Sequence, residues 1–380
     1  MKKAILYVGL DVHARSITAA VAEAGRQGEV RLQGKIDASL HEVDKLLTRL
    51  GHPERKLEIC YEAGPCGYVL ARHLAKKGLS CTVVAPSRTP KGSGDKVKTD
   101  RRDAQALARL HRAGELTAVA VPAEDDEAIR DLCRARTDAV AAMRCARSQM
   151  NAFLLRHGHH SAGKAQWGDA AKGTLRKLGL RHAAMGVVLE DYISTIDEAF
   201  ARIARLEKAM EEHLEKWSQK PVVQALMGLR GFRTVAAMIT VSELGNIHRF
   251  ASARQLMAYL GLVPAESSSG ESRRAGAITK TGNTHLRWLL NECAQHYRLP
   301  PKIGEALAGR QRAIPAAHRA EVKKISWKCQ QRLYHKHSRL GARRKMKQKV
   351  QIALARELCG FVWALLKAVQ PPGPPAAAAS

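Results

Sequence analysis

Several features that would place this chain in other classes of protein are scarce or absent. Eight cysteines are spread singly over 380 residues and form no C-x-x-C pair, which argues against a zinc ribbon or a disulfide framework and fits reduced thiols in a cytosol. No apolar run reaches the roughly 18 residues of a membrane span. At the N-terminus Asp11 interrupts the apolar run before a signal-peptide core could form. We therefore expect a cytoplasmic protein with no membrane partner.

Acidic residues are also few, because 35 Asp and Glu stand against 63 Lys and Arg and leave a formal net charge of +28. A surplus of this size favours a polyanionic partner, of which nucleic acid is the commonest. Hydrophobic residues make up 45% and charged residues 26% of the chain, values that exclude disorder throughout. We expect a nucleoid-associated, nucleic-acid-binding protein of two or three domains.

The order of expected elements indicates an α/β domain followed by helices. Residues 4–37 alternate apolar runs with turn residues, as three strands of a meander do. Ser39 then suits the N-cap of a helix, and the segments LEICYEAG and LSCTVVAP read as strands on either side of a second helix. This pattern predicts an α/β layered domain over residues 1–123.

Helical periodicity dominates residues 124–218, which we predict to be a helical connector. Apolar residues fall seven apart from Leu189 to Trp217, with Tyr192, Ala199, Leu206 and finally His213 at the second position of the heptad. The spacing is typical of a coiled-coil-like seam. It leaves open whether the helix packs within its own domain, pairs with an antiparallel helix or contacts a second subunit.

Two further regions complete the predicted organisation. Residues 219–309 read as mostly helical, interrupted by a Gly/Ser-rich loop at PAESSSGES, and residues 310–380 as a basic helical extension with a disordered Pro/Ala tail. Between Arg310 and Lys349 there are fourteen Lys or Arg and one acid. Four cations spaced four apart form one cationic helix face that we expect to contact nucleic-acid phosphates: Lys324, Lys328, Arg332 and Lys336.

A few acids occur where the expected fold would bring them together. Asp11 lies within the first apolar strand and Glu62 at the end of a later one, while Asp100 and Asp103 share one face at the start of a helix that Thr99 could cap. Taken singly, each acid could be structural. Taken together, clustered carboxylates without His or Cys nearby predict a site for Mg²⁺ or Mn²⁺, suited to phosphoryl transfer.

Paired motifs carry a resemblance to a known family. The N-terminal set GLDVH, YEAGPCGY, APSRTP and KTDRRDAQALARL, with the C-terminal set RFASARQLMAYLGLVPAESSSG and RRAGAITKTGNTHLRWLL, resembles the IS110/IS1111 insertion-sequence transposases over about residues 5–298. The resemblance implies a RuvC-like, RNase H-type domain whose Asp-Glu-Asp-Asp tetrad is Asp11, Glu62, Asp100 and Asp103. It also implies a helical coiled-coil connector and a mostly α-helical transposase domain that supplies a serine nucleophile.

The family's Ser-Gly element points to Ser269, with Ser268 as the fallback. Arg273, Arg274 and Lys280 follow closely enough in sequence to clamp a scissile phosphate. Family members are similar in being recombinases that a structured non-coding bridge RNA guides to donor and target DNA, and the resemblance implies a dimer or tetramer.

Three functions remain open at this point. The leading one is a DNA transposase or recombinase that forms a serine–phosphate intermediate with metal assistance. The second is a RuvC-like junction-resolving endonuclease that uses water as its nucleophile, and the third is a non-enzymatic nucleic-acid-binding protein.

Overall fold

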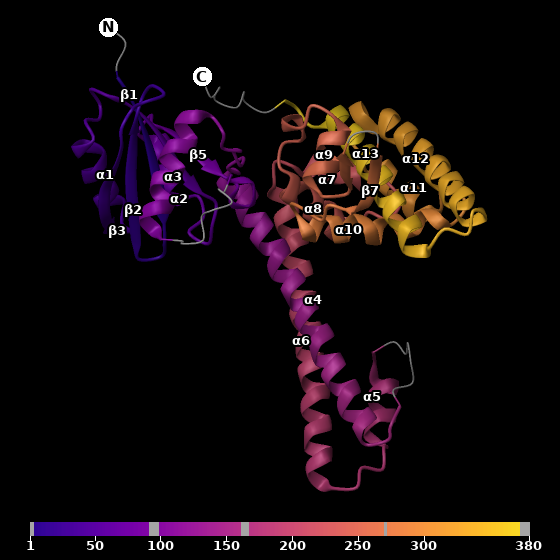
Figure 1. Ribbon diagram of the computed structural model, residues 1–380. Coiled ribbons are helices and arrows are strands. Elements are labelled where there is room, and N and C mark those ends of the chain that lie inside the picture. Colours follow the sequence, from indigo (N-terminus) through magenta and orange to yellow (C-terminus); the bar gives the residue numbers. More distant parts are fainter. Residues whose placement is uncertain (1–3, 91–98, 161–166, 270–271, 373–380) are drawn as a thin grey trace. The chain divides into compact units, whose positions relative to one another are not determined.

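The computed structural model describes residues 4–90, 99–160, 167–269 and 272–372 (Figure 1). Contacts divide the chain into two compact units, Met1–Pro122 and Ala123–Ser380. The first is a mixed α/β unit and the second is mostly helical, which confirms the predicted fold class at this level. In the described ranges, no helix combines the length and apolar content needed to cross a membrane.

The first unit is built on a five-stranded sheet in the order β3-β2-β1-β4-β5. Strands β1, β2 and β3 are antiparallel neighbours, whereas β1, β4 and β5 run parallel. The strands are β1 (Ile5–Val12), β2 (Ser16–Glu23), β3 (Val30–Asp37), β4 (Lys56–Glu62) and β5 (Ser80–Val84). The predicted meander and the two later strands are therefore confirmed.

Helices cover both faces of this sheet (Figure 1). On one face α1 (Leu40–Arg49) and α2 (Val69–Lys76) pack against the main core of the unit. On the other face α3 (Asp100–Ala113) packs through small side chains, Ala104 and Ala108, against Ala20 and Ala22 of β2. A 3₁₀ turn, η1 (Pro86–Arg88), follows β5. The two faces thus differ, because small alanine side chains line the contact with α3, whereas larger side chains of α1 and α2 fill the core on the other face.

Both predicted helix caps are present. The Ser39 hydroxyl accepts a hydrogen bond from the Glu42 N–H at 3.2 Å, and the Thr99 hydroxyl accepts one from the Arg102 N–H at 3.4 Å. Thr99 therefore fixes the residue at which α3 begins, and places Asp100 and Asp103 in its first turn.

Two long antiparallel helices begin the second unit, α4 (Glu124–Arg156) and α6 (Ala183–Lys216), with the short α5 (Asp169–Arg176) beside them (Figure 1). The residues at seven-residue intervals from Leu189 to Trp217 are buried, so the seam exists and lies within one chain. At the predicted second position Tyr192, Ala199 and Leu206 are half-buried, whereas His213 is exposed and its neighbour Leu214 is buried. The predicted second position is wrong only at His213, because a straight helix of 3.6 residues per turn buries i+4 as readily as i+3.

The remaining elements surround one continuous core that includes Phe232, Met238, Leu290, Leu333 and Leu358. Segments beyond residue 310 contribute their inner faces to this core, and the predicted disordered tail, 371–380, lies outside the described residues from 373 onward. The helices are α7 (Lys220–Leu226), α8 (Thr234–Leu244), α9 (Ala253–Tyr259), α10 (Thr284–Ala294), α11 (Glu305–Arg312), α12 (Ala316–Ala342) and α13 (Lys347–Val369), with 3₁₀ turns η2 (Ile247–Arg249) and η3 (Gln295–Arg298).

The segment expected to be a Gly/Ser-rich loop is instead an antiparallel hairpin of β6 (Pro264–Ser269) and β7 (Ser272–Ile278). The prediction failed because serine and glycine have weak strand propensity and the pairing depends on the partner strand.

Candidate functional site

Asp11 and Glu62 lie at the ends of two neighbouring parallel strands, on the same face of the sheet. Leu10 of β1 is paired in register with Tyr61 of β4, and both of these side chains are buried in the core on the α1 and α2 face. Because successive side chains of a strand alternate between faces, Asp11 and Glu62 point to the face covered by α3. Two acids that are 51 positions apart in sequence therefore lie at the same ends of neighbouring strands, on one face of the sheet.

Gly9 allows α3 to bring its own acids to this edge. A Cβ atom at Gly9 would lie 2.4 Å from the Ala104 carbonyl oxygen and 2.4 Å from the Ala108 nitrogen, distances that no side chain tolerates. The backbone of α3 thus rests directly on β1. As a result, Asp100 and Asp103 in the first turn of α3 lie near Asp11.

Three side chains at this edge form a close group. One ligand atom each from Asp11, His13 and Asp100 lies within 4.8 Å of the others. The His13 Nε2 is 3.1 Å from Asp11 Oδ2 and 3.6 Å from Asp100 Oδ1. From β3, Lys35 Nζ is 3.6 Å from Asp100 Oδ2. The expectation of carboxylates with no histidine nearby is therefore wrong, because His13 follows Asp11 by two residues and reaches the same face.

The electrostatics of the group favour a cation. Burial raises the pKa of Asp11, the His13 ring opposes that rise, and the negative charges of Asp103 and Asp100 add to it. A bound divalent ion would relieve this repulsion. The donors are carboxylate oxygens and an imidazole nitrogen, which are suitable ligands for such an ion, so the residues present fit a divalent metal.

Glu62 and Asp103 lie outside the close group of three. The Thr89 hydroxyl donates a hydrogen bond of 2.9 Å to Glu62 Oε1, which fixes one oxygen of this carboxylate. Thr89 belongs to the motif APSRTP. The structure thus brings Asp11 and Asp100 together directly, while Glu62 is held by Thr89 and Asp103 acts on Asp11 through its charge.

His13, Lys35 and Thr89 were not recognised as site residues from the sequence. A signal existed for His13, because residues i and i+2 of a strand share a face. For Lys35 the signal is only in the tertiary pairing: Asp11 is opposite Thr18 on β2, and Thr18 is opposite Lys35 on β3.

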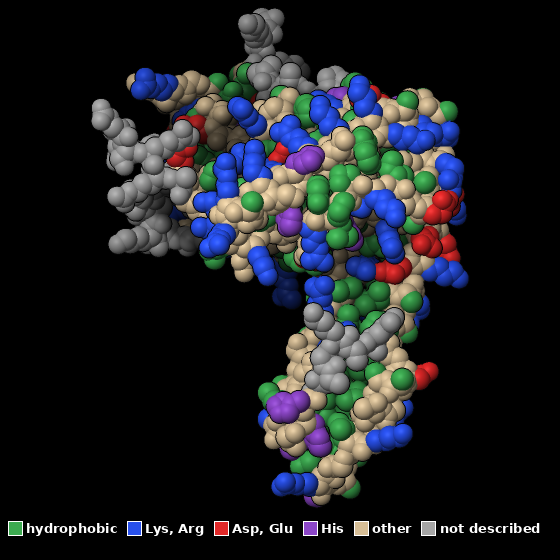
Figure 2. Space-filling view, turned by 90° about the vertical axis from the view of Figure 1, so that its right-hand side faces the viewer, with side chains coloured by type: hydrophobic (Ala, Val, Ile, Leu, Met, Phe, Trp, Pro, Cys, Tyr) green, Lys and Arg blue, Asp and Glu red, His purple; other side chains and the backbone are tan. Residues whose placement is uncertain are grey.

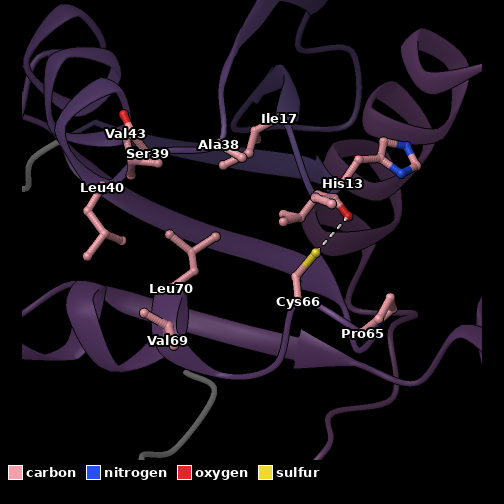
Figure 3. A pocket seen from close by; sticks show the side chains of 12 residues that line it. His13, Ile17, Ala38, Ser39, Leu40, Val43, Pro65, Cys66, Val69 and Leu70 are labelled. Atoms are coloured by element: carbon pink, nitrogen blue, oxygen red, sulfur yellow. Dashed lines mark hydrogen bonds between the residues drawn. The ribbon is translucent and has the colours of Figure 1, made fainter.

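A cavity of about 370 Å³ lies next to this edge of the sheet, between β1, α1 and α2 (Figure 3). It is mostly apolar, with Leu40, Val69 and Leu70 along one side. The Cys66 thiol donates a weak hydrogen bond of 3.9 Å to the Val12 carbonyl. His13 belongs to both the cavity lining and the acidic edge, and its ring points away from the apolar side chains (Figure 3).

In the second unit, the candidate serines lie near the end of a hairpin. Ser269 is paired with Ser272 and Ser268 with Arg273. The pair Ser269–Ser272 is the last one before residues 270–271, which are not described. The side chains of residues 267–275, including those of Arg273 and Arg274, also lie outside the described part of the chain. Lys280 is exposed at the other end of β7, with its backbone at a φ of 56°.

The base of this hairpin is tightly held. A Cβ atom at Gly282 would lie 1.8 Å from the Tyr259 carbonyl oxygen, and the Arg287 guanidinium donates hydrogen bonds to the carbonyls of Leu260 and Thr281 at 2.9 and 2.8 Å. These contacts fix both strands where they join α9 and α10.

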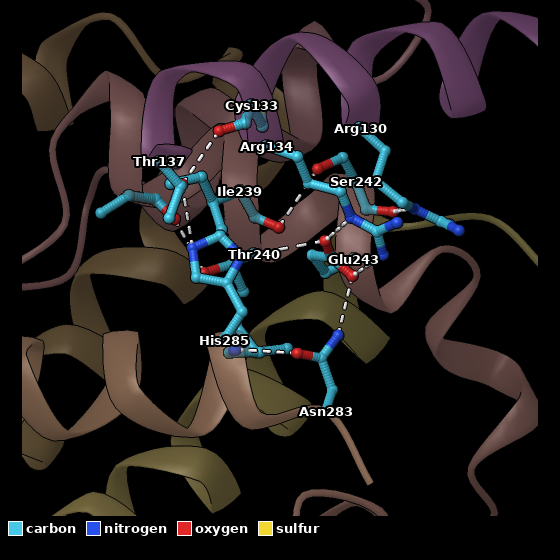
Figure 4. A network of polar contacts seen from close by, with 12 residues as sticks. Arg130, Cys133, Arg134, Thr137, Ile239, Thr240, Ser242, Glu243, Asn283 and His285 are labelled. Atoms are coloured by element: carbon cyan, nitrogen blue, oxygen red, sulfur yellow. Dashed lines mark hydrogen bonds and ion pairs between the residues drawn. The ribbon is translucent and has the colours of Figure 1, made fainter. Parts of the chain in front are cut away.

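A buried carboxylate, that of Glu243, is hydrogen-bonded to Asn283, the residue that follows Gly282 (Figure 4). Glu243 of α8 receives hydrogen bonds from Arg134 Nε of α4 at 2.8 Å and from Asn283 Nδ2 at 2.7 Å, with His285 Nδ1 at 3.9 Å. Burial by itself would raise the pKa of Glu243, but the interactions with His285, Arg134 and Asn283 outweigh it and lower the pKa to about 2. The ionised Glu243 thus joins α4, α8 and the start of α10.

The predicted cationic face of α12 is divided between two roles. Arg332 and Lys336 both pair with Glu357 of α13, with 2.5 Å between Lys336 Nζ and Glu357 Oε2. Of these four cations, Lys324 and Lys328 are exposed and do not pair with Glu357. Figure 2 shows Lys and Arg side chains spread over one face of the molecule, with Asp and Glu in small groups.

An α/β unit with carboxylates gathered at one sheet edge, followed by a basic helical unit, defines a class of enzyme that acts on nucleic acid. Comparison with known proteins identifies the family. Residues 8–158 match a family model described as "Transposase" and named for the DEDD transposases of IS110, and residues 223–304 match the model described as "Transposase IS116/IS110/IS902 family".

Relatives agree with these matches. The chain is 44% identical over 361 residues to the protein named "Putative transposase y4qE" of Sinorhizobium fredii, covering 95% of this chain and 88% of the relative. It is 26% identical over 348 residues to the transposase of insertion sequence IS1533 from Leptospira borgpetersenii, covering 91% and 99%. The IS1111A transposase of Coxiella burnetii is 26% identical over 200 residues, 51% of this chain and 53% of that one. The chain belongs to the IS110/IS1111 family of insertion-sequence transposases, as its motifs predicted.

Proposed function

We propose that this transposase cleaves and rejoins DNA strands with Ser269 as the nucleophile, with a divalent metal held at the edge of the sheet, and under the guidance of a structured non-coding RNA. The observation that carries the metal site is the meeting of Asp11 and Asp100 within one close group. The family match covers both this region and the serine hairpin.

The sheet supports an RNase H-type assignment of the first unit. Its order is β3-β2-β1-β4-β5, with three antiparallel strands followed by two parallel ones. In such an arrangement the central strand β1 carries Asp11 and its parallel neighbour carries Glu62. We infer the RuvC-like character of this unit from this topology together with the position of the acids.

Asp11, Glu62, Asp100 and Asp103 are the residues we assign to holding the metal. A divalent ion held by carboxylates supplies electrostatic stabilisation of the negative charge that develops on phosphoryl oxygens. The carboxylates keep the ion in place, and Thr89 fixes the orientation of Glu62. The ion we propose is Mg²⁺ or Mn²⁺.

Ser269 is assigned to covalent catalysis. The Ser269 oxygen forms an ester bond to phosphorus as its hydroxyl proton passes to water, and the bond from phosphorus to a deoxyribose oxygen breaks, so that this oxygen takes a proton from water and leaves as a hydroxyl group. Attack by the deoxyribose oxygen of another strand reverses the step and releases the serine. Because the phosphate ester is conserved, strands are exchanged without an external energy source. We assign Arg273, Arg274 and Lys280 to binding the phosphate.

The proposed partners are donor and target DNA, a bridge RNA and further copies of the chain, as a dimer or tetramer. The charge of +28 supports binding of polyanions. Lys324 and Lys328 on α12, with Arg332 and Lys336 beside them, are the proposed contacts for phosphates.

The products separate this proposal from a junction-resolving nuclease. Incubating the protein with its DNA and divalent metal should give a protein–DNA adduct, whereas a nuclease that uses water gives free ends alone and a mere binding protein gives neither. Asp11→Asn should abolish the adduct and leave DNA affinity largely intact, because a ligand is lost while the basic surplus remains. Equal loss of cleavage and binding with the fold intact would contradict the assignment of Asp11.

A further inference from the structure

The side chain at the acidic edge that no role yet explains is His13. It follows the end of β1, where its backbone N–H donates a hydrogen bond of 2.9 Å to the Ser16 carbonyl and closes the turn into β2. This turn holds the ring on the same face as Asp11. Half of the side chain is exposed, at 52%, so burial does not account for its position.

The distances around His13 match those between neighbouring ligands of one metal ion. In an octahedral site with bonds of about 2.1 Å, adjacent ligand atoms lie about 3.0 Å apart. The His13 Nε2 is 3.1 Å from Asp11 Oδ2 and 3.6 Å from Asp100 Oδ1. The first distance matches this spacing, and a shift of about 0.6 Å in the Asp100 side chain would bring the second to it.

The other basic group at this edge cannot take the same role. Lys35 Nζ is 3.6 Å from Asp100 Oδ2, but an ammonium group has three donors and no lone pair. The neutral imidazole of His13 offers a lone pair on a ring nitrogen. Of the two, only His13 is able to ligate a metal.

We propose that His13 Nε2 is a direct ligand of the divalent ion held by Asp11 and Asp100, and that it makes the site select Mn²⁺ over Mg²⁺. An imidazole nitrogen suits transition-metal ions, whereas Mg²⁺ prefers an all-oxygen shell. The proposal deepens the proposed function, because it rests on the metal site assigned there. The competing account is that His13 is only a hydrogen-bond partner of Asp11 that a metal displaces.

The test is the electron-spin-echo modulation spectrum of Mn²⁺ bound to the full-length protein, combined with Mn²⁺ and Mg²⁺ titrations. Wild type should show coupling of Mn²⁺ to a ligand nitrogen, and the coupling should change from that of ¹⁴N to that of ¹⁵N when the histidines are labelled with ¹⁵N. His13→Gln should lose this coupling and bind Mn²⁺ at least about tenfold more weakly, with less than about a threefold change for Mg²⁺. His41→Gln, an exposed histidine at the start of α1, is the matched control and should retain the wild-type spectrum.

The outcomes separate this inference from the metal site itself. Mn²⁺ that binds without nitrogen coupling, or with coupling that persists in His13→Gln, overturns the role of His13 and leaves the carboxylate site standing. Mn²⁺ binding that survives unchanged in Asp11→Asn, or no binding to wild type, overturns the metal site and the inference together. Circular dichroism of each variant shows that the fold is retained.

Discussion

At Gly9 the backbone of β1 and the backbone of α3 are in direct contact. Because a Cβ there would lie 2.4 Å from backbone atoms of Ala104 and Ala108, Gly9→Ala must push α3 away from the sheet. We expect a loss of about 1–3 kcal/mol in the free energy of unfolding, which is the usual cost of overpacking. Divalent-metal affinity should fall as well, because Asp100 and Asp103 move with α3.

Gly64→Ala is a suitable control for this prediction, since a Cβ at Gly64 would meet no atom closer than 3.9 Å. Thermal unfolding and Mn²⁺ titration of the two variants provide the measurement. Equal stability and equal metal affinity for both would contradict the role given to Gly9.

Glu243 supports a prediction about pH. Its pKa is lowered from 4.5 to about 2 in the folded chain, so its contribution to stability is fully present above pH 4.5 and is lost as the pH falls towards 2. A shift of this size corresponds to a contribution on the order of 3 kcal/mol. Glu243→Gln should therefore destabilise the second unit near neutral pH and flatten the acid dependence of unfolding between pH 4.5 and 2.

Denaturant unfolding across that pH range checks this expectation, with the exposed Glu211→Gln on α6 as control. If the free energy of unfolding of Glu243→Gln fell between pH 4.5 and 2 as steeply as that of wild type, then Arg134, Asn283 and His285 would not stabilise the charge of Glu243 as described.

For individual residues, sequence reasoning succeeded where a local rule applied and failed where pairing decided. Thr99 as a cap follows from its place before a helix. By contrast, the contact of Lys35 with Asp100 depends on the register of three strands, and the hydrogen bond from Thr89 to Glu62 joins two segments 27 residues apart. Such contacts leave no periodic signal in the sequence.

The same contrast holds for whole elements. Alternation and capping residues predicted the five strands of the sheet and the long helices, because each of those elements has its own periodic pattern. The hairpin that carries Ser269 was predicted as a loop, since its pairing with β7 depends on the second strand. The α4–α6 pairing was one of three alternatives until the antiparallel packing resolved it.

The basic helix α12 shows why substitution is a better probe than truncation. Val322 and Leu333 of α12 and Leu358 of α13 belong to the core of the second unit, so removal of residues 310–380 would unfold it. We expect Lys324→Ala with Lys328→Ala to weaken nucleic-acid binding and reduce the slope of log affinity against log salt by about 1–2 for duplex DNA.

Arg332→Ala with Lys336→Ala is the matched comparison, since it removes the same charge from the same helix. The Arg332→Ala and Lys336→Ala substitutions should also lower the free energy of unfolding, because the mostly buried Glu357 carboxylate loses both of its ion-pair partners. Binding and salt dependence measured by fluorescence anisotropy, together with thermal unfolding, separate the two effects. The same salt slope for Lys324→Ala/Lys328→Ala as for wild type would contradict the proposed contact.

Across the whole molecule, the residues proposed to bind nucleic acid differ from those proposed to carry out the reaction. The surplus of 28 positive charges is distributed over the chain, whereas the acids assigned to the metal are only four. Changes at these acids or at the serine should therefore alter reaction and leave most of the affinity in place. Loss of affinity in step with loss of reaction would argue against this separation.

The central claim is that strand exchange passes through a bond between DNA and Ser269. The most direct measurement is mass-spectrometric mapping of the trapped protein–DNA adduct, carried out on wild type, Ser269→Ala and Ser268→Ala. We predict that the phosphate is found on Ser269, and that Ser269→Ala forms no adduct and exchanges no strands while still binding DNA. Ser268→Ala should form the adduct and exchange strands. Normal recombination by both variants, or cut DNA with no adduct in wild type, would contradict the serine mechanism and favour a nuclease that uses water.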